Sequence, residues 1–106
     1  DRVFLAPQGQ GQGLTVRPAP GLEGFIEVRG LGIRRCDHLS QCELGLVVDL
    51  GAADAARLPE PGSLQTAICG VVLPRIPVES GHDALPLVLG WLLTDPAGCA
   101  KSRKTP

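Results

Sequence analysis

Glycine and proline divide this chain into short apolar runs, which restricts it to a fold built mainly from short strands. The chain contains 14 Gly and 10 Pro among 106 residues. Both residue types interrupt helices and mark turns, so long regular elements are excluded over most of the length. Strand-forming runs lie at residues 3–5, 14–17, 25–28, 45–50, 65–69 and 71–73. The sequence therefore predicts a strand-rich architecture.

The spacing of these runs predicts some of their pairing. Runs 3–5 and 14–17 flank a tip rich in Gly and Gln, and we expect them to form a hairpin. Run 45–50 is nearly continuous and β-branched, which is typical of a strand covered on both faces. Pro74 and Pro77 limit the last run to an edge or irregular strand, because proline lacks an N–H for the ladder.

One stretch, residues 84–93, has a helical pattern. Asp83 precedes it as a candidate N-cap, and Pro86 lies in the first turn, where a missing N–H does no harm. Gly90 weakens the helix. Residues 52–58 are expected to form no more than a surface turn of helix. The apolar residues at helical spacing, which predict an amphipathic helix docked on the sheet, are Leu85, Val88, Leu89 and Leu92.

The imbalance between strands and helices bears on the domain organisation. An α/β domain that lacks its first part explains it better than a complete α+β fold. The chain has no methionine, so we expect residue 1 not to be a natural translation start and the chain to be processed or a fragment. Residues 1–93 are expected to belong to the domain, and residues 94–106 to form a polar, disordered tail.

Composition excludes several classes of function. A net charge of -1 and 3% aromatic residues argue against binding to nucleic acid, which needs basic patches or stacking rings. The longest apolar stretch, residues 84–93, is about half of a bilayer span. With no membrane segment and no secretory signal in the sequence, we expect a cytoplasmic protein.

The four cysteines leave three interpretations open. Cys36, His38 and Cys42 place three soft ligands close together, although no fourth zinc ligand is evident. Free thiols in a reducing compartment are the simpler explanation. A secreted disulfide framework is the third possibility, and the hydrophobic content of 43% argues against it.

Lysine is confined to Lys101 and Lys104. The pattern G-x-x-x-x-G-K-[ST] does not occur in the chain, so these residues cannot supply a phosphate-binding loop of that type. A nucleotide site would need residues from elsewhere.

Residues 25–33 combine an apolar run with two charges and a glycine loop. Glu27 and Arg29 interrupt the apolar run, and a buried charge would need a partner such as each other, a metal or a phosphate. Gly30 and Gly32 allow positive φ or the close approach of a ligand. From residue chemistry, Glu27 is equally a metal ligand or the partner of Arg29 on an exposed strand.

The run Ile26-Glu-Val-Arg-Gly-Leu-Gly-Ile33 closely resembles the signature of HPr kinase/phosphorylase. This bacterial enzyme family phosphorylates a serine of the phosphocarrier protein HPr and removes that phosphate again. The resemblance extends from Asp1 to about Leu93. It implies an α/β phosphate-loop kinase domain related to phosphoenolpyruvate carboxykinase, in a protein that is often hexameric. The nucleotide loop, and with it the ATP site, would lie in a missing N-terminal portion.

The resemblance also implies roles for individual residues. Asp1 would accept the proton of the substrate serine and return it in the reverse reaction, although a solvated terminal aspartate is the simpler interpretation. Glu27 would ligate Mg²⁺, a hard ion that suits a carboxylate. The loop expected to position the HPr partner comprises Ile26, Val28, Arg29, Gly30, Leu31, Gly32 and Ile33.

Two further matches lie in the second half of the chain. Arg57 resembles a catalytic arginine that neutralises charge on the transferred phosphoryl group; a solvated helix arginine is the alternative. The family's Pro-Val-Arg-Pro-Gly-Arg loop, linked to dephosphorylation, matches Pro77, Val78, Glu79, Ser80, Gly81 and His82. Glu79 and His82 stand where arginines are usual, so we expect weakened binding of the phosphate on which phosphorylase activity depends. His82 can still carry a charge near neutral pH.

The function expected from these residues is Mg²⁺- and ATP-dependent phosphorylation of an HPr-like serine by the complete protein. The chain alone, without a phosphate loop, is expected to be inactive. The alternative is a non-catalytic interaction module that keeps the partner-docking loop and has lost the chemistry.

Overall fold

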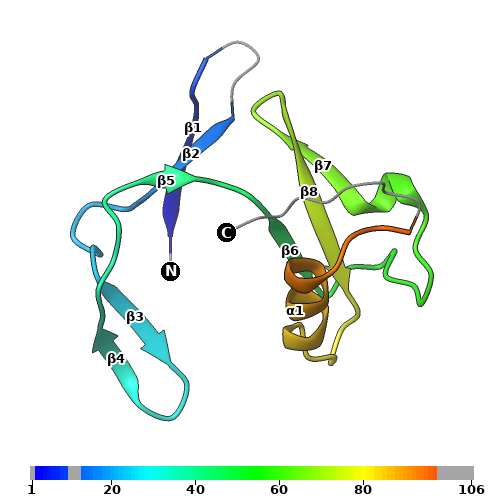
Figure 1. The fold of residues 1–106 in the computed structure, drawn as a ribbon. Coiled ribbons are helices and arrows are strands. Elements are labelled where there is room, and N and C mark those ends of the chain that lie inside the picture. The colour runs from blue at the N-terminus through cyan, green and yellow to red at the C-terminus, as the bar shows by residue number, and fades with distance from the viewer. Residues whose placement is uncertain (1, 10–12, 98–106) are drawn as a thin grey trace. The chain divides into compact units, whose positions relative to one another are not determined.

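The computed structural model describes residues 2–9 and 13–97, which form eight strands, a short 3₁₀ helix and one α-helix (Figure 1). These elements fall into two compact units. The first holds the described residues up to Gly45 together with Ala67–Val72, and the second holds Leu46–Thr66 and the described residues from Leu73 onward. This is a mixed architecture of three small sheets and one helix.

The first sheet confirms the predicted hairpin. Strands β1 (Val3–Pro7) and β2 (Leu14–Pro18) pair antiparallel, and β5 (Cys42–Glu43) adds to the other edge of β2. Leu14 is fully buried and anchors this sheet, since its carbonyl also accepts the N–H of Leu44 at 2.8 Å.

The second sheet is a hairpin formed by β3 (Phe25–Val28) and β4 (Gly32–Arg35). The N–H of Leu31 donates to the carbonyl of Val28 at 2.8 Å and closes the turn. Gly30 and Gly32 have φ values of 93° and 87°, which L side chains rarely adopt, so the Gly-Leu-Gly sequence is what permits this turn. β3 and its loop were predicted, whereas β4 was not.

The third sheet has the order β6-β8-β7, made of Val47–Leu50, Val71–Val78 and Gln65–Ile68. β6 and β8 are parallel, with Val47 opposite Arg75. Cys69 and Gly70, at φ 51° and 77°, form the two-residue turn between β7 and β8, as in a type I′ hairpin.

The prediction that proline limits the last strand to an edge or irregular strand is wrong, because β8 is the central strand and runs unbroken through both Pro74 and Pro77. β6 pairs only with Arg75–Val78, while the short β7 adjoins the turn at the other end. Successive N–H groups of a strand point to opposite sides. Where β8 has a partner on one side only, every second N–H faces away from that partner, so a proline at such a position removes no hydrogen bond of the sheet.

The α-helix α1 (Leu85–Leu93) confirms the predicted helix. Ala84 occupies the N-cap position, and Asp83 contributes by accepting the Leu85 N–H at 3.0 Å. The predicted docking face is wrong in part, because Leu85, Leu89 and Leu92 are all exposed. The half-buried side of the helix consists instead of Ala84, Val88 and Trp91.

Residues 52–58 form turns and bends, within the expectation of no more than a surface turn of helix, and the helical turn in this region is the 3₁₀ helix η1 (Pro61–Leu64). One other local expectation is wrong. β6 is not covered on both faces, since Asp49 is exposed and Leu50 is 69% exposed. The β-branched run at residues 45–50 therefore predicted the strand correctly, but the predicted burial of both its faces is wrong.

The apolar core of the described residues is small. Leu14, Leu73, Ile76 and Val78 are its buried hydrophobic side chains, and three of them lie on β8. Of the predicted tail, residues 94–97 are exposed, and the rest lies outside the described residues. Among the helices described, none has the length and apolar character to cross a membrane.

Candidate functional site

A pocket of about 650 Å³ lies within the second unit. Its wall is mainly apolar, with a few polar groups, as is usual for small-molecule sites. The turn segment before η1 forms one side, the end of β8 another, and α1 a third. The lining residues are Ala55, Ala56, Arg57, Pro59, Leu64, Ile76, Pro77, Glu79, His82, Pro86, Leu87, Gly90, Trp91 and Thr94.

This pocket brings together residues that the sequence analysis assigned separately. Arg57 comes from the segment before η1, whereas Pro77, Glu79 and His82 come from the end of β8 and the turn after it. They are separated by about twenty positions in the sequence and line one cavity. A guanidinium and an imidazole in one pocket offer donors that suit an anionic ligand.

The turn after β8 gives the polar wall its geometry. Val78 is 1% exposed and fixes the end of the strand, after which the chain reverses as the His82 N–H donates to the Glu79 carbonyl at 3.0 Å. Gly81 has a φ of 84° and permits this reversal. His82 Nε2 lies 3.8 Å from Glu79 Oε1, and both side chains are exposed. Glu79 therefore offsets the charge of a protonated His82.

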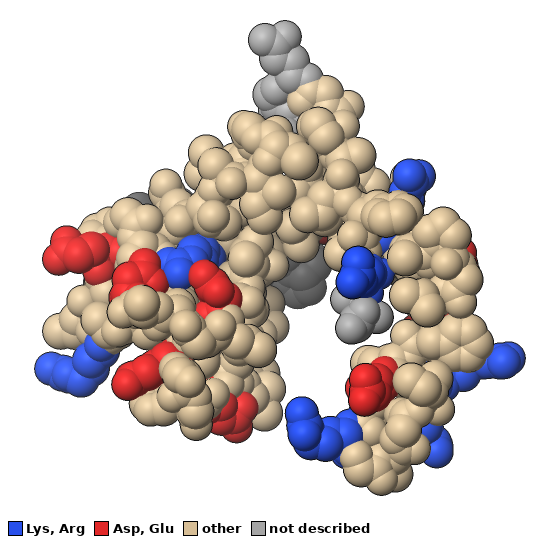
Figure 2. Space-filling view, turned by 180° about the vertical axis from the view of Figure 1, so that it is seen from behind, with Lys and Arg blue, Asp and Glu red and all other residues tan. Residues whose placement is uncertain are grey.

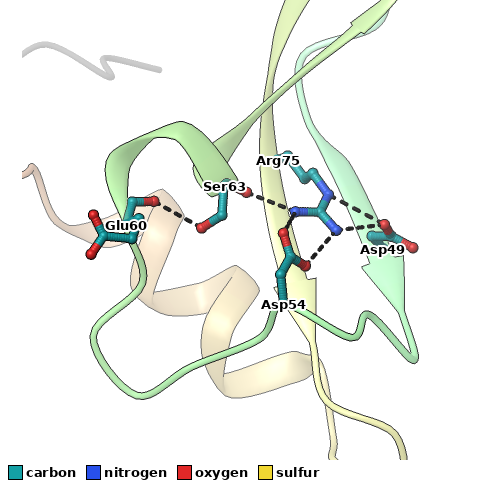
Figure 3. Close-up of polar contacts among 5 residues, drawn as sticks. All are labelled: Asp49, Asp54, Glu60, Ser63 and Arg75. Atoms are coloured by element: carbon teal, nitrogen blue, oxygen red, sulfur yellow. Dashed lines mark hydrogen bonds and ion pairs between the residues drawn. The ribbon is translucent and has the colours of Figure 1, made fainter.

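A second group of polar side chains is centred on Arg75 of β8, the strand that carries this turn (Figure 3). Arg75 donates through Nη1 and Nη2 to the two carboxylate oxygens of Asp54, each at 2.9 Å. Its Nε and Nη2 donate to one oxygen of Asp49 at 3.2 and 2.8 Å, and Nη1 also reaches the Ser63 carbonyl at 2.8 Å. We call Arg75, Asp49, Asp54 and Ser63 the arginine clasp.

The arginine clasp changes the electrostatics of its members. The hydrogen bond from Arg75 is the main cause that lowers the pKa of Asp54 below 3.8, and burial opposes it. Hydrogen bonds to Asp54 and then Asp49 raise the pKa of Arg75, so it stays charged at every ordinary pH. The Arg75 side chain is 13% exposed, whereas the two carboxylates are about half exposed.

Sequence reasoning missed the arginine clasp, although a signal was present. Arg75 stands inside the apolar run Val71–Val78, where a charge needs a partner. The corresponding expectation, that Glu27 and Arg29 are buried charges with partners, is wrong. β3 and its loop are exposed, and among the described residues neither side chain forms an ion pair or a side-chain hydrogen bond.

The hairpin of β3 and β4 carries most of the predicted docking loop. Its apolar side chains are exposed, Leu31 to 64% and Ile33 to 67%. Arg35 lies over the ring of Phe25 at 5.4 Å, so this end combines apolar and cationic surface. On the face drawn in Figure 2, basic side chains predominate over the part of the chain that holds this hairpin, and acidic side chains predominate over the part that holds α1.

No cluster of three or more His, Cys, Asp or Glu that could hold a metal occurs among the described residues. The cysteine–histidine metal hypothesis is therefore wrong, even though Cys36, His38 and Cys42 line a common pocket of about 490 Å³. Cys36, Cys42 and Cys69 are free and exposed, against a disulfide framework. Glu27 alone does not make a Mg²⁺ site, and Asp1 lies outside the described residues.

No family model and no curated protein matches the chain. Among solved structures, its fold is similar to that of the HPr(Ser) kinase/phosphatase from Coxiella burnetii, with a TM-score of 0.55 at 20% sequence identity. The match covers 82% of this chain and 59% of that chain, so this chain spans less than two thirds of the neighbour's length. At this identity the likeness shows the fold: mixed sheets with one helix, resembling the HPr kinase fold.

Proposed function

We propose that this chain is the C-terminal part of an HPr kinase/phosphorylase-like domain that transfers a phosphoryl group to a serine hydroxyl. One observation carries the proposal. The pocket of the second unit unites Arg57 with the turn that follows β8, in a chain whose fold is similar to that of an HPr(Ser) kinase/phosphatase. The fold likeness alone is weaker, because folds host many functions and must be joined to a site.

The chemistry assigned to the pocket is stabilisation of a phosphate. Charge on a transferring phosphoryl group is spread over its oxygens, and a guanidinium at the pocket wall can neutralise it. Arg57 has this role in the proposal. Glu79 beside His82 reduces the positive charge available to free phosphate, so we propose that phosphorylase activity is weak.

The remaining parts of the proposed site involve residues whose roles rest on the resemblance. Asp1 would act as the acid–base group, and Glu27 would contribute one ligand to Mg²⁺, with the rest coming from groups outside the described residues and from substrate phosphates. ATP would bind to a loop that this chain does not contain. The partner would be an HPr-like phosphocarrier docked on residues 26–33, and the complete protein would be a homo-oligomer, a hexamer by resemblance.

A non-catalytic interaction module is the second candidate. The exposed apolar hairpin of β3 and β4 favours it, because such a surface can dock a partner without any chemistry. Glu79 and His82 also favour the interaction module, because they stand where the family usually has arginines and so weaken phosphate binding.

The coding sequence upstream of Asp1 separates the two candidates at little cost. The kinase proposal requires an in-frame Asp codon immediately before Asp1 and a G-x-x-x-x-G-K-[ST] motif about 20 codons earlier. An in-frame start codon upstream of Asp1, with neither of these features encoded between it and Asp1, would contradict the kinase and support the interaction module.

A further inference from the structure

The arginine clasp has a consequence for the pocket, and we propose that Arg75 is a positioning residue for Arg57. It holds the segment from Asp54 to Ser63 against β8 and so keeps Arg57 at the pocket wall. The effect on phosphoryl transfer rests on the proposed function, whereas the effect on the segment does not.

Arg75 binds the segment from Asp54 to Ser63 at both of its ends. Asp54 and Ser63 lie nine positions apart, and both bind the same guanidinium atom, Nη1 of Arg75, at 2.9 and 2.8 Å. Arg57 lies between them, in a stretch of turns and bends. The segment is thus closed into a loop whose ends are fixed to one side chain of β8.

The other hydrogen bonds of this region are fewer and mostly local. The Ala52 N–H donates to the Val78 carbonyl at 2.9 Å, just ahead of the segment. Within the segment, the N–H and the hydroxyl of Ser63 both donate to the Glu60 carbonyl, at 2.9 and 2.8 Å (Figure 3). A segment held mainly through one side chain should open locally when that side chain is changed.

The geometry requires arginine rather than any cation. Arg75 uses all three of its nitrogens, and both oxygens of Asp54 are engaged in a parallel two-bond contact. A planar fork makes such contacts, whereas lysine presents one ammonium on a flexible stem. Lysine at position 75 would keep the charge and lose the simultaneous grip on Asp49, Asp54 and Ser63.

The charge balance also separates the tasks of the two arginines. Asp49 and Asp54 both pair with Arg75, so its charge is compensated and it is not a phosphate ligand. Arg57 lines the pocket and, among the described residues, has no ion pair, so its charge is available to an anion. Arg75 acts on the pocket through Arg57.

Limited tryptic digestion of the 106-residue chain tests the positioning directly. The Arg57–Leu58 bond is a trypsin site inside the segment, and a site after position 75 remains in Arg75→Lys. We expect Arg75→Lys and Asp54→Asn to speed cleavage after Arg57 by about tenfold, because cleavage follows the population of the open segment. Arg34→Lys, on the exposed strand β4, should leave the rate at Arg57 unchanged.

Two results would overturn the inference. One is cleavage after Arg57 at the wild-type rate in both variants. The other is equal acceleration after positions 57 and 75 in Arg75→Lys, which would mean general unfolding of the sheet rather than release of the segment.

Activity of the longer protein that contains these residues gives the second readout. Arg57→Ala and Arg75→Lys should each lower kcat for phosphorylation of HPr, with KM for HPr unchanged, and the double variant should be no slower than Arg57→Ala alone. Multiplying effects would show that Arg75 does not act through Arg57. If the wild-type protein transfers no phosphate, the proposed function fails while the digestion result still decides the positioning.

Discussion

Replacing Leu73 by alanine tests whether the sheet core is centred on β8. Leu73 is 5% exposed on the central strand, whereas Leu50, on the neighbouring β6, is 69% exposed. The same Leu→Ala change at the two sites removes the same atoms. A buried leucine costs about 2–5 kcal/mol, since lost burial and the cavity left behind add together. An exposed one costs no more than about 0.5 kcal/mol.

Urea unfolding followed by tryptophan fluorescence measures this difference. Trp91 is the single tryptophan of the chain and belongs to α1, so its emission reports on the unit that contains Leu73. With an m-value of about 2 kcal/mol per molar urea, Leu73→Ala should lower the midpoint by roughly 1–2.5 M. Leu50→Ala should shift it by less than about 0.25 M.

The comparison refutes the reasoning if the two variants lose the same stability. That outcome would mean that Leu50 is buried in solution or that Leu73 is not. A changed m-value in either variant would instead indicate a change in the denatured state or loss of two-state behaviour, and the midpoints could then be compared only through a full fit.

Three further predictions concern the loop glycine, acid stability and the thiols. Gly30→Ala should destabilise the fold by about 1–2 kcal/mol, because φ at position 30 is 93°. Gly62→Ala, at a position without a positive φ, should leave thermal unfolding nearly unchanged; an added Cβ would meet no atom at either site, so only the backbone conformation differs. The lowered pKa of Asp54 means that its contribution to stability is present above about pH 4 and is lost as the pH falls through its folded-state pKa, so Asp54→Asn should flatten the acid side of an unfolding curve. A colorimetric thiol titration under native conditions should find prompt reaction at Cys36, Cys42 and Cys69, and slow reaction would contradict their exposure.

Local patterns predicted much of the fold. The hairpin of β1 and β2, the strand β3 and the helix α1 all follow from signals within a few residues: alternating apolar runs, Gly-rich tips and an Asp before an apolar helical repeat. The strand β4 was missed because Arg34 and Arg35 look polar in sequence, and an exposed hairpin strand needs no apolar face.

Features that depend on distant partners could not be predicted in the same way. Arg75 contacts Asp49 and Asp54, which precede it by 26 and 21 positions, and no local pattern encodes that pairing. The buried face of α1 is a similar case. Several apolar stripes were available in an almost wholly apolar helix, and packing selected the one that contains Val88 and Trp91.

In the candidate site, too, the individual residues could be predicted from local sequence, but their arrangement in space could not. The sequence indicated Arg57 and the turn after β8 one by one, and only the fold places them around one pocket. A charge within a buried apolar run needs a partner, but the sequence alone did not show which of the two runs is buried. Glu27 and Arg29 lie on an exposed hairpin, whereas Arg75 is the charge that required partners and has three.

Phosphoserine formation on HPr is the most direct measurement of the central claim, that these residues form part of a phosphoryl-transfer site. The longer protein that contains them would be incubated with HPr, ATP and Mg²⁺, and intact HPr would be weighed by mass spectrometry. The account predicts a mass gain of one phosphoryl group, a rate reduced about 100-fold or more in Arg57→Ala, and no gain with the 106-residue chain alone. Full activity in Arg57→Ala, or no phosphorylation by the longer wild-type protein, would contradict it.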